Sequence, residues 1–298
     1  MKNASDKDKA LALRLTIKTY DNKISKETVI PDYVGPIERH ENGTAQWITG
    51  TMDHPVHGKV AFVGFRGSDQ GTANPLEKQD KEKSDWAFNY DFKLIRAVVE
   101  DGQTLIVPYG NENSNIKMHR GDREHYGLSR EEVRKFVIWA IESGIKKIWF
   151  FGHSLGGAIC TCAWIDVFHM LNDEIKIAVN QGGVSIDFTG FAFASPAVGN
   201  QEFADSFNRR ANGHFTNEWY SADPVHTVPT FWQGYRHVKV EKGHADWVSV
   251  ISSPIFCCTQ WATCGALPTW AYFDHFPQRL LAVYEHKPVP RWWELKWE

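Results

Sequence analysis

The sequence predicts an α/β protein with a mainly parallel central sheet and helices on both faces. Strand-like apolar runs alternate with amphipathic, helix-like stretches along most of the chain, which is the pattern of sheets covered by helices. Lys147–Phe151 is a nearly continuous apolar run, suited to a central strand that is buried on both faces. No repeat or linker interrupts this order. We therefore interpret residues 1–298 as one domain with its core at about 43–284.

The other strands follow from short apolar runs bounded by turn residues. Two of them flank the turn-forming sequence MDHPVH and should pair with each other, namely Gly43–Met52 and Gly58–Phe65. Further strands are expected at Gln103–Val107, Thr189–Ala194, Phe215–Tyr220 and Tyr235–Glu241.

Three helices are expected between and after these strands. One should begin at Ser129, which has capping-box spacing to Glu132, and close at Gly144. The others are Leu155–Leu171 and the terminal Pro277–Tyr284, and Asn89–Val98 also has amphipathic helical spacing.

Composition narrows the class of protein. A net charge of -3 and a pI near 6.5 predict no nucleic-acid partner. The N-terminus lacks the apolar run of a signal peptide, so a cytoplasmic location is the default expectation, with export by another route left open. The uncharged segment 247–273 contains Pro and Gly and is not expected to be a transmembrane helix.

The five cysteines are odd in number and absent from the first half of the chain, which does not indicate a disulfide framework. Cys160 and Cys162 would diverge on a helix, so we expect buried thiols and no shared metal. Neither a metal nor a cofactor is predicted.

The sequence Gly152-His153-Ser154-Leu155-Gly156 is the strongest chemical signal in the chain. It is a G-x-S-x-G at the junction of a buried strand and a helix, which is typical of the nucleophile elbow of α/β-hydrolases. The glycines permit close backbone approach, and the helix dipole favours negative charge beside Ser154. The pattern predicts Ser154 as a nucleophile.

A serine nucleophile needs a base and an acid that orients the base, and in this fold both follow the serine on loops after later strands. Asp223 comes directly after the strand Phe215–Tyr220 and before a proline, and is better placed than Asp187 or Asp205. His275 is the favoured base, because it precedes the terminal helix. The alternatives are His244, after a strand, and the less favoured His226 and His237.

Several motifs in order give the region 58–284 a family resemblance. The chain resembles the class 3 lipases, typified by secreted fungal triacylglycerol lipases. The motifs that carry it are Val63-Gly64-Phe65-Arg66-Gly67-Ser68, Asp85-Trp86 through Asp91-Phe92, His119-Arg120-Gly121, the elbow from Gly152 to Ala158, Ala194-Ser195-Pro196-Ala197-Val198-Gly199-Asn200, Asp223-Pro224-Val225 with Pro229, and Asp274-His275.

The resemblance implies carboxylic ester hydrolysis through an acyl-enzyme. It implies an oxyanion hole from the Leu155 amide and from Ser68. The expected substrates are acylglycerol-type or short to medium acyl esters. The expected partners are therefore a small-molecule or lipid ester substrate and a lipid interface. Phospholipase A, feruloyl-type esterase, and a catalytically silent signalling or scaffold protein remain alternatives.

Two segments bear on the substrate. The charged stretch 69–84 departs from the short connection usual in the family and predicts weak interfacial activation. The aromatic-rich segment 247–273 is interpreted either as a wall of the acyl pocket or as core.

Overall fold

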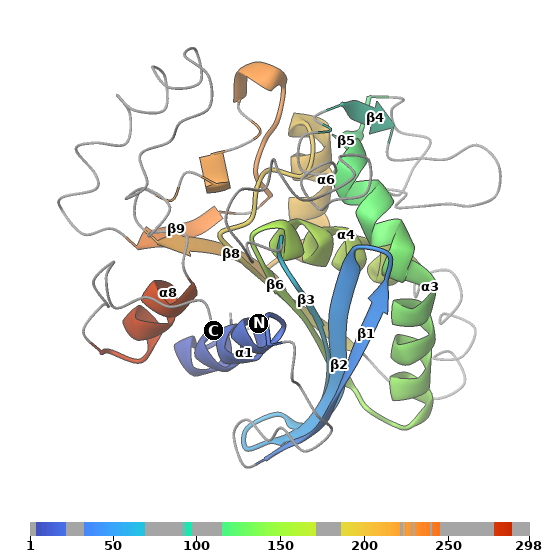
Figure 1. Ribbon diagram of the computed structural model, residues 1–298, viewed down its shortest axis with the longest axis vertical. Coiled ribbons are helices and arrows are strands. Elements are labelled where there is room, and N and C mark those ends of the chain that lie inside the picture. The colour runs from blue at the N-terminus through green and yellow to red at the C-terminus, as the bar shows by residue number, and fades with distance from the viewer. Residues whose placement is uncertain are drawn as a thin grey trace.

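The computed structural model describes residues 4–21, 33–68, 91, 93–96, 115–170, 186–220, 223, 225–227, 229, 231–238, 240–244 and 277–287. Its centre is a seven-stranded sheet with strand order β1-β2-β3-β6-β7-β8-β9 (Figure 1). The strands are β1 (Val34–Asn42), β2 (Ala45–His54), β3 (Gly58–Phe65), β6 (Lys147–His153), β7 (Asp187–Phe193), β8 (Phe215–Tyr220) and β9 (Val240–His244). β1, β2 and β3 pair antiparallel, and the neighbours among β3, β6, β7, β8 and β9 pair parallel. The predicted mainly parallel sheet is confirmed.

The middle strands are apolar because both of their faces are covered. All six residues from Val60 to Phe65 are buried in β3, as are the six from Ile148 to His153 in β6. The register pairs Phe65 with Gly152, and His153 with Phe193. The carboxyl ends of β3, β6 and β7 therefore lie level at one edge of the sheet.

One face of the sheet is covered by α3 (Arg120–Glu142), α4 (Leu155–Met170) and α6 (Gln201–Ala211) (Figure 1). A buried carboxylate on α4 ties α3 to it: Asp166 accepts hydrogen bonds from Tyr126 Oη at 2.8 Å and from Arg130 at 3.1 Å. Cys160 and Cys162 are free and buried in α4, and burial raises the pKa of both thiols. The expected buried thiols are confirmed.

The opposite face is covered by α1 (Asp6–Lys18) and α8 (Pro277–Tyr284) (Figure 1). Leu13 and Leu15 of α1 are fully buried against this side of the sheet. An ion pair joins Lys9 to Glu218 of β8, and Arg14 Nε donates to Glu285 Oε1 beyond α8 at 2.6 Å. α8 was expected from the sequence and α1 was not, although Ser5 and Asp8 form a reciprocal capping box at the start of α1.

The helix expected from Ser129 begins earlier, at Arg120, with His119 as its N-cap. Ser129 lies inside the helix, where its hydroxyl donates to the Tyr126 carbonyl at 3.1 Å. Its capping-box spacing was therefore misleading. Gly144, with φ 80°, follows the end of the helix as predicted.

Two strand assignments also need correction. The predicted strand Tyr235–Glu241 is wrong in its bounds: β9 starts at Val240, because Arg236 instead bridges to Gly199 outside the sheet. Within Asn89–Val98, where a helix was expected, β4 (Leu94–Arg96) pairs with β5 (Lys117–His119). The predicted strand Gln103–Val107 lies outside the described residues.

Among the described helices, none combines the length and apolar character needed to cross a bilayer.

Candidate active site

Ser154 occupies a sharp turn between β6 and α4, as the sequence predicted. Its φ is 59°, a left-handed conformation that is uncommon for a residue other than glycine and that clusters at functional sites. Its amide donates to Phe193 O at 2.9 Å, and its carbonyl accepts from the Gly157 amide at 2.9 Å. These bonds, from β7 on one side and α4 on the other, hold the strained turn in place.

The glycines of the elbow allow main-chain segments to touch. A Cβ on Gly152 would lie 2.0 Å from the Gly156 carbonyl oxygen, and a Cβ on Gly156 would lie 2.3 Å from Phe65 O. Real Cβ atoms essentially never make contacts this short. β3, β6 and the first turn of α4 are therefore packed backbone against backbone around Ser154.

The segment after β3 lies against the elbow. A Cβ on Gly67 would be 3.1 Å from Ser154 Cβ and 2.6 Å from His153 O, so Gly67 passes directly beside the serine. Ser68 follows and is buried at 4% exposure. Leu155, on the other side, is the first residue of α4. The two residues predicted for the oxyanion hole thus belong to segments that adjoin Ser154; their role stays a prediction.

Tyr20, a residue not predicted for the site, also contacts the elbow. Tyr20, just after α1, places its hydroxyl 2.9 Å from His153 Nδ1. The same hydroxyl would lie 2.1 Å from a Cβ on Gly67, and the Arg66 guanidinium lies 5.8 Å from the Tyr20 ring centroid. Tyr20 therefore touches both the elbow and the segment that carries Ser68. Nothing in the local sequence around Tyr20 indicates this contact, because its partners are distant in the chain.

Asp223 is fully buried beyond the carboxyl end of β8. Its amide donates to Tyr220 O at 3.2 Å, and its Oδ1 accepts from the Val225 amide at 2.8 Å. β8 is linked to the loop after β7 by the bond from the Ala194 amide to Glu218 O, at 2.6 Å. Asp223 thus lies at the same sheet edge as Ser154, two strands away.

The rejected acids lie elsewhere. Asp187 starts β7, at the opposite end of the strands, where Lys147 and His214 bind its carboxylate at 2.8 and 3.1 Å. Asp205 is exposed on α6.

Two of the alternative bases, His226 and His237, contact main-chain carbonyl oxygens. His226 Nδ1 lies 2.8 Å from Asp223 O, and its ring stacks on Trp219 at 4.2 Å. His237 contacts His226 O through Nε2, and burial lowers the pKa of His237 to about 4. His237 was expected inside a strand but precedes β9.

The remaining predicted features fall on residues that the structure describes only in part or leaves out. His244 is the last residue of β9. His275, the segment 69–84 and the segment 247–273 lie outside the described residues. The assignment of the base therefore stays a prediction.

Two further motifs of the sequence meet beside the site. The His119 amide donates to Val198 O at 2.7 Å, and the Asn200 amide donates to Lys117 O at 3.0 Å. The side chains of His119 and Asn200 cap α3 and α6 respectively. The two motifs therefore fix the starts of α3 and α6.

Comparison with known proteins identifies the family. The model of the family described as lipase (class 3) matches residues 62–232, which include the segment after β3, the elbow and Asp223. The chain belongs to the class 3 lipase family. Its members are serine ester hydrolases that act on lipid esters, so the predicted family and enzyme class are confirmed.

Relatives of known structure share the fold of this class 3 lipase chain. A triacylglycerol lipase from Penicillium expansum is 18% identical, with a TM-score of 0.56, and the match covers 82% of this chain and 83% of that one. A fungal lipase solved as an inhibitor complex is 17% identical, with a TM-score of 0.57 and coverage of 79% and 80%. These similarities confirm the α/β-hydrolase fold.

A curated relative, phospholipase A1-IIgamma of Arabidopsis thaliana, is 25% identical over 166 residues. The match covers 50% of this chain and 35% of the plant protein, so this chain matches only about a third of the length of that relative.

Proposed function

We propose that this class 3 lipase cleaves carboxylic esters with Ser154 as nucleophile, Asp223 as orienting acid and His275 as base. The observation that carries the proposal is the strained Ser154 turn, held at φ 59° with Gly67 packed beside it. Strained backbone of this kind persists only where the surroundings over-determine it. Hydrogen bonds to β7 and to the first turn of α4 hold this turn in place.

The chemistry follows from the roles of these groups. His275 would take the proton of Ser154 Oγ as the oxygen attacks the ester carbonyl, and would return it to the departing alcohol. The Leu155 amide and Ser68 would bind the carbonyl oxygen as it becomes negative. An acyl-enzyme forms, and water then releases the acid by the same steps. Asp223, anchored by the Val225 amide, would keep the imidazole oriented.

The proposed substrates are acylglycerol-type or short to medium acyl esters, hydrolysed below their solubility limit. The charged stretch 69–84, which contains Glu77, Lys78, Asp80, Lys81, Glu82 and Lys83, supports this. Such a composition favours solvent over an oil–water interface.

Phospholipase A activity is a second candidate. The similarity to the plant phospholipase A1 covers half of this chain and supports an ester of a phospholipid as an additional substrate.

The rate of hydrolysis against ester concentration tests the substrate proposal, with nitrophenyl esters from acetate to palmitate and with phosphatidylcholine vesicles. We expect smooth saturation on short and medium esters. A sharp rise in rate as the ester forms an emulsion would contradict weak interfacial activation. Fatty acid released from phosphatidylcholine faster than from the nitrophenyl esters would establish the phospholipase instead. Absence of turnover on all of these esters would indicate the silent alternative.

A further inference from the structure

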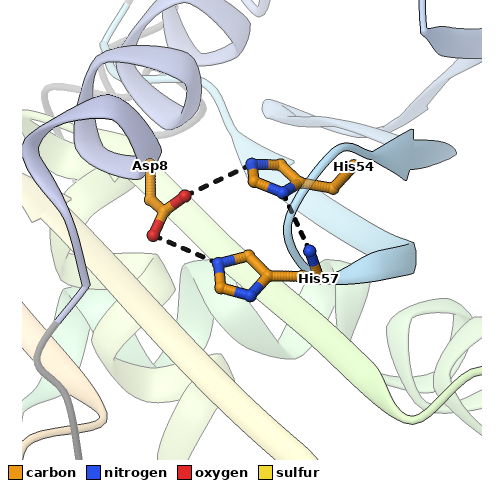
Figure 2. A group of neighbouring side chains, drawn as sticks. All are labelled: Asp8, His54 and His57. Atoms are coloured by element: carbon orange, nitrogen blue, oxygen red, sulfur yellow. Dashed lines mark hydrogen bonds and ion pairs between the residues drawn. The ribbon is translucent and has the colours of Figure 1, made fainter.

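Three polar side chains meet at the end of the sheet that is remote from Ser154. Asp8 lies in the first turn of α1, His54 ends β2, and His57 lies in the turn before β3 (Figure 2). Because Ser68 follows the other end of β3, this cluster is separated from the elbow by the length of the strand, roughly 20 Å. It plays no part in the chemistry described above.

The contacts join α1 to the β2–β3 turn. His54 Nε2 lies 3.2 Å from Asp8 Oδ1, and His57 Nε2 lies 3.2 Å from Asp8 Oδ2. The two rings stack, with centroids 4.5 Å apart. The side chains of Asp8 and His54 are only 8% and 6% exposed, whereas His57 is 24% exposed. The carboxylate also accepts the Ser5 amide at 3.1 Å.

The hydrogen bonds of His54 determine where its proton lies. The amides of Val56 and His57 both donate to His54 Nδ1, at 3.2 Å each. Nδ1 therefore carries a lone pair, and the proton of the neutral ring is on Nε2, where it is donated to Asp8.

This arrangement distinguishes the cluster from a metal centre. Two histidines and an aspartate are ligands that Zn²⁺ accepts. A metal at His54 Nε2 would move the ring proton to Nδ1, where it would face two amide donors. Metal-bound histidines instead donate their second N–H to an acceptor. The geometry thus favours a proton on this nitrogen over a cation.

A second proton on His54 would meet the same obstacle, because it also must go to Nδ1. Burial lowers the pKa of His54, the positive charges of His57 and Lys147 lower it further, and Asp8 opposes them. The ring also lies against Tyr33 and Trp149.

For Asp8, burial alone would raise the pKa, but hydrogen bonds from His57 and Ser5 lower it. The Asp8 carboxyl therefore stays ionised to lower pH than an ordinary aspartate.

We propose that Asp8, His54 and His57 form an acid-labile clamp that fastens the start of α1 to the β2–β3 turn. The folded state keeps His54 neutral, while the unfolded chain takes up the proton near the ordinary value of 6.5. The stability that the clamp supplies is complete above this pH. It is lost as the pH falls through the lower folded-state pKa of His54. A proton on Nδ1 opposes the Val56 and His57 amides, so acid displaces the His54 ring from this turn and loosens the attachment of α1.

The test compares unfolding equilibria from about pH 8 to about pH 5 in wild type and His54→Asn. Asn keeps a side-chain acceptor for the turn amides and does not titrate. Between pH 6.5 and 5, the unfolding constant of wild type should rise more steeply than that of the variant, by up to about tenfold per pH unit. His286→Asn is the matched control, because His286 is exposed and has φ 52°, a backbone that Asn tolerates. It should follow wild type. Parallel curves for wild type and His54→Asn would overturn the clamp.

Two further measurements keep the proposal falsifiable if His54→Asn folds poorly. In wild type, hydrogen exchange of residues 6–18, corrected for intrinsic rates, should accelerate relative to residues 155–170 as the pH falls from about 7.5 to about 5.5. Equal behaviour of both helices would contradict the clamp. Thermal unfolding with added ZnCl₂ at neutral pH should be unchanged. A zinc-dependent rise in Tm that is lost in His57→Gln would replace the clamp with a metal site.

Discussion

At the carboxyl end of β3 the neighbouring segments touch through main-chain atoms, whereas at its amino end they are joined by the side chains of Asp8, His54 and His57. Gly152 and Gly156 leave no room for a Cβ beside Ser154. The clamp holds α1 through three titratable groups instead. Packing through main-chain atoms fixes positions without regard to pH, which suits a nucleophile. Attachment through titratable side chains varies with pH, which suits the start of α1, the end of that helix remote from the elbow.

The largest effect should come from removing the Ser154 hydroxyl. Ser154→Ala should lower kcat by a factor on the order of 10⁶ while the unfolding temperature changes little, because the packing of the elbow does not depend on Oγ. Ser206→Ala removes another buried serine hydroxyl, on α6, and should keep wild-type kcat. Substantial turnover by Ser154→Ala would show that the nucleophile lies elsewhere.

Removing the proposed base, His275, should lower activity as strongly as removing the Ser154 hydroxyl. His275→Ala should lower kcat about as much as Ser154→Ala, and the double variant should lose little more, because triad members act as a unit. His244→Ala should retain most activity. The reverse result would make His244 the base, and additive losses would separate His275 from the triad. Single-turnover kinetics with a nitrophenyl ester measures each case.

A methyl group added at Gly156, where main-chain segments touch, should lower activity and stability by an intermediate amount. Gly156→Ala would place Cβ 2.3 Å from Phe65 O, so α4 and β3 must separate. We expect kcat/KM to fall by roughly 10²-fold and stability to fall by about 1–3 kcal/mol.

Gly127→Ala is the matched control for this change. Gly127 is exposed in α3, and its Cβ would meet nothing within 4 Å. That variant should gain about 0.5–1 kcal/mol. Denaturant unfolding measures both variants, and equal stability of the two would refute tight packing at the elbow.

The smallest effect should come from Tyr20, which connects the end of α1 to the elbow. Tyr20→Phe removes the hydroxyl 2.9 Å from His153 Nδ1 and should cost about 1 kcal/mol of stability. A fall in kcat of only a few-fold is expected, with KM unchanged, because the hydroxyl positions the elbow and touches no substrate. A change in KM alone, with kcat unchanged, would instead place Tyr20 in the substrate site.

The sequence predicts the elbow well because its signals are local. A buried apolar run, the glycines and a helix are adjacent in the sequence around Ser154. β8 was predicted with its observed bounds from an equally local signal, and Asp223 follows it directly. The start of α3 was misplaced because Ser129 has capping-box spacing but the true N-cap is His119, a residue type not favoured there. Tyr20, and the partners of His54, could not be predicted. Their contacts join residues far apart in the chain, and only the packing of α1 brings them together.

Covalent labelling tests the central claim most directly. The wild-type chain should react with a fluorophosphonate, and mass spectrometry of its peptides should place the adduct on Ser154 alone. Prior incubation with a hydrolysable ester should slow this labelling. An enzyme that turns over esters but carries the adduct on another residue, or carries none, would contradict Ser154 as the nucleophile.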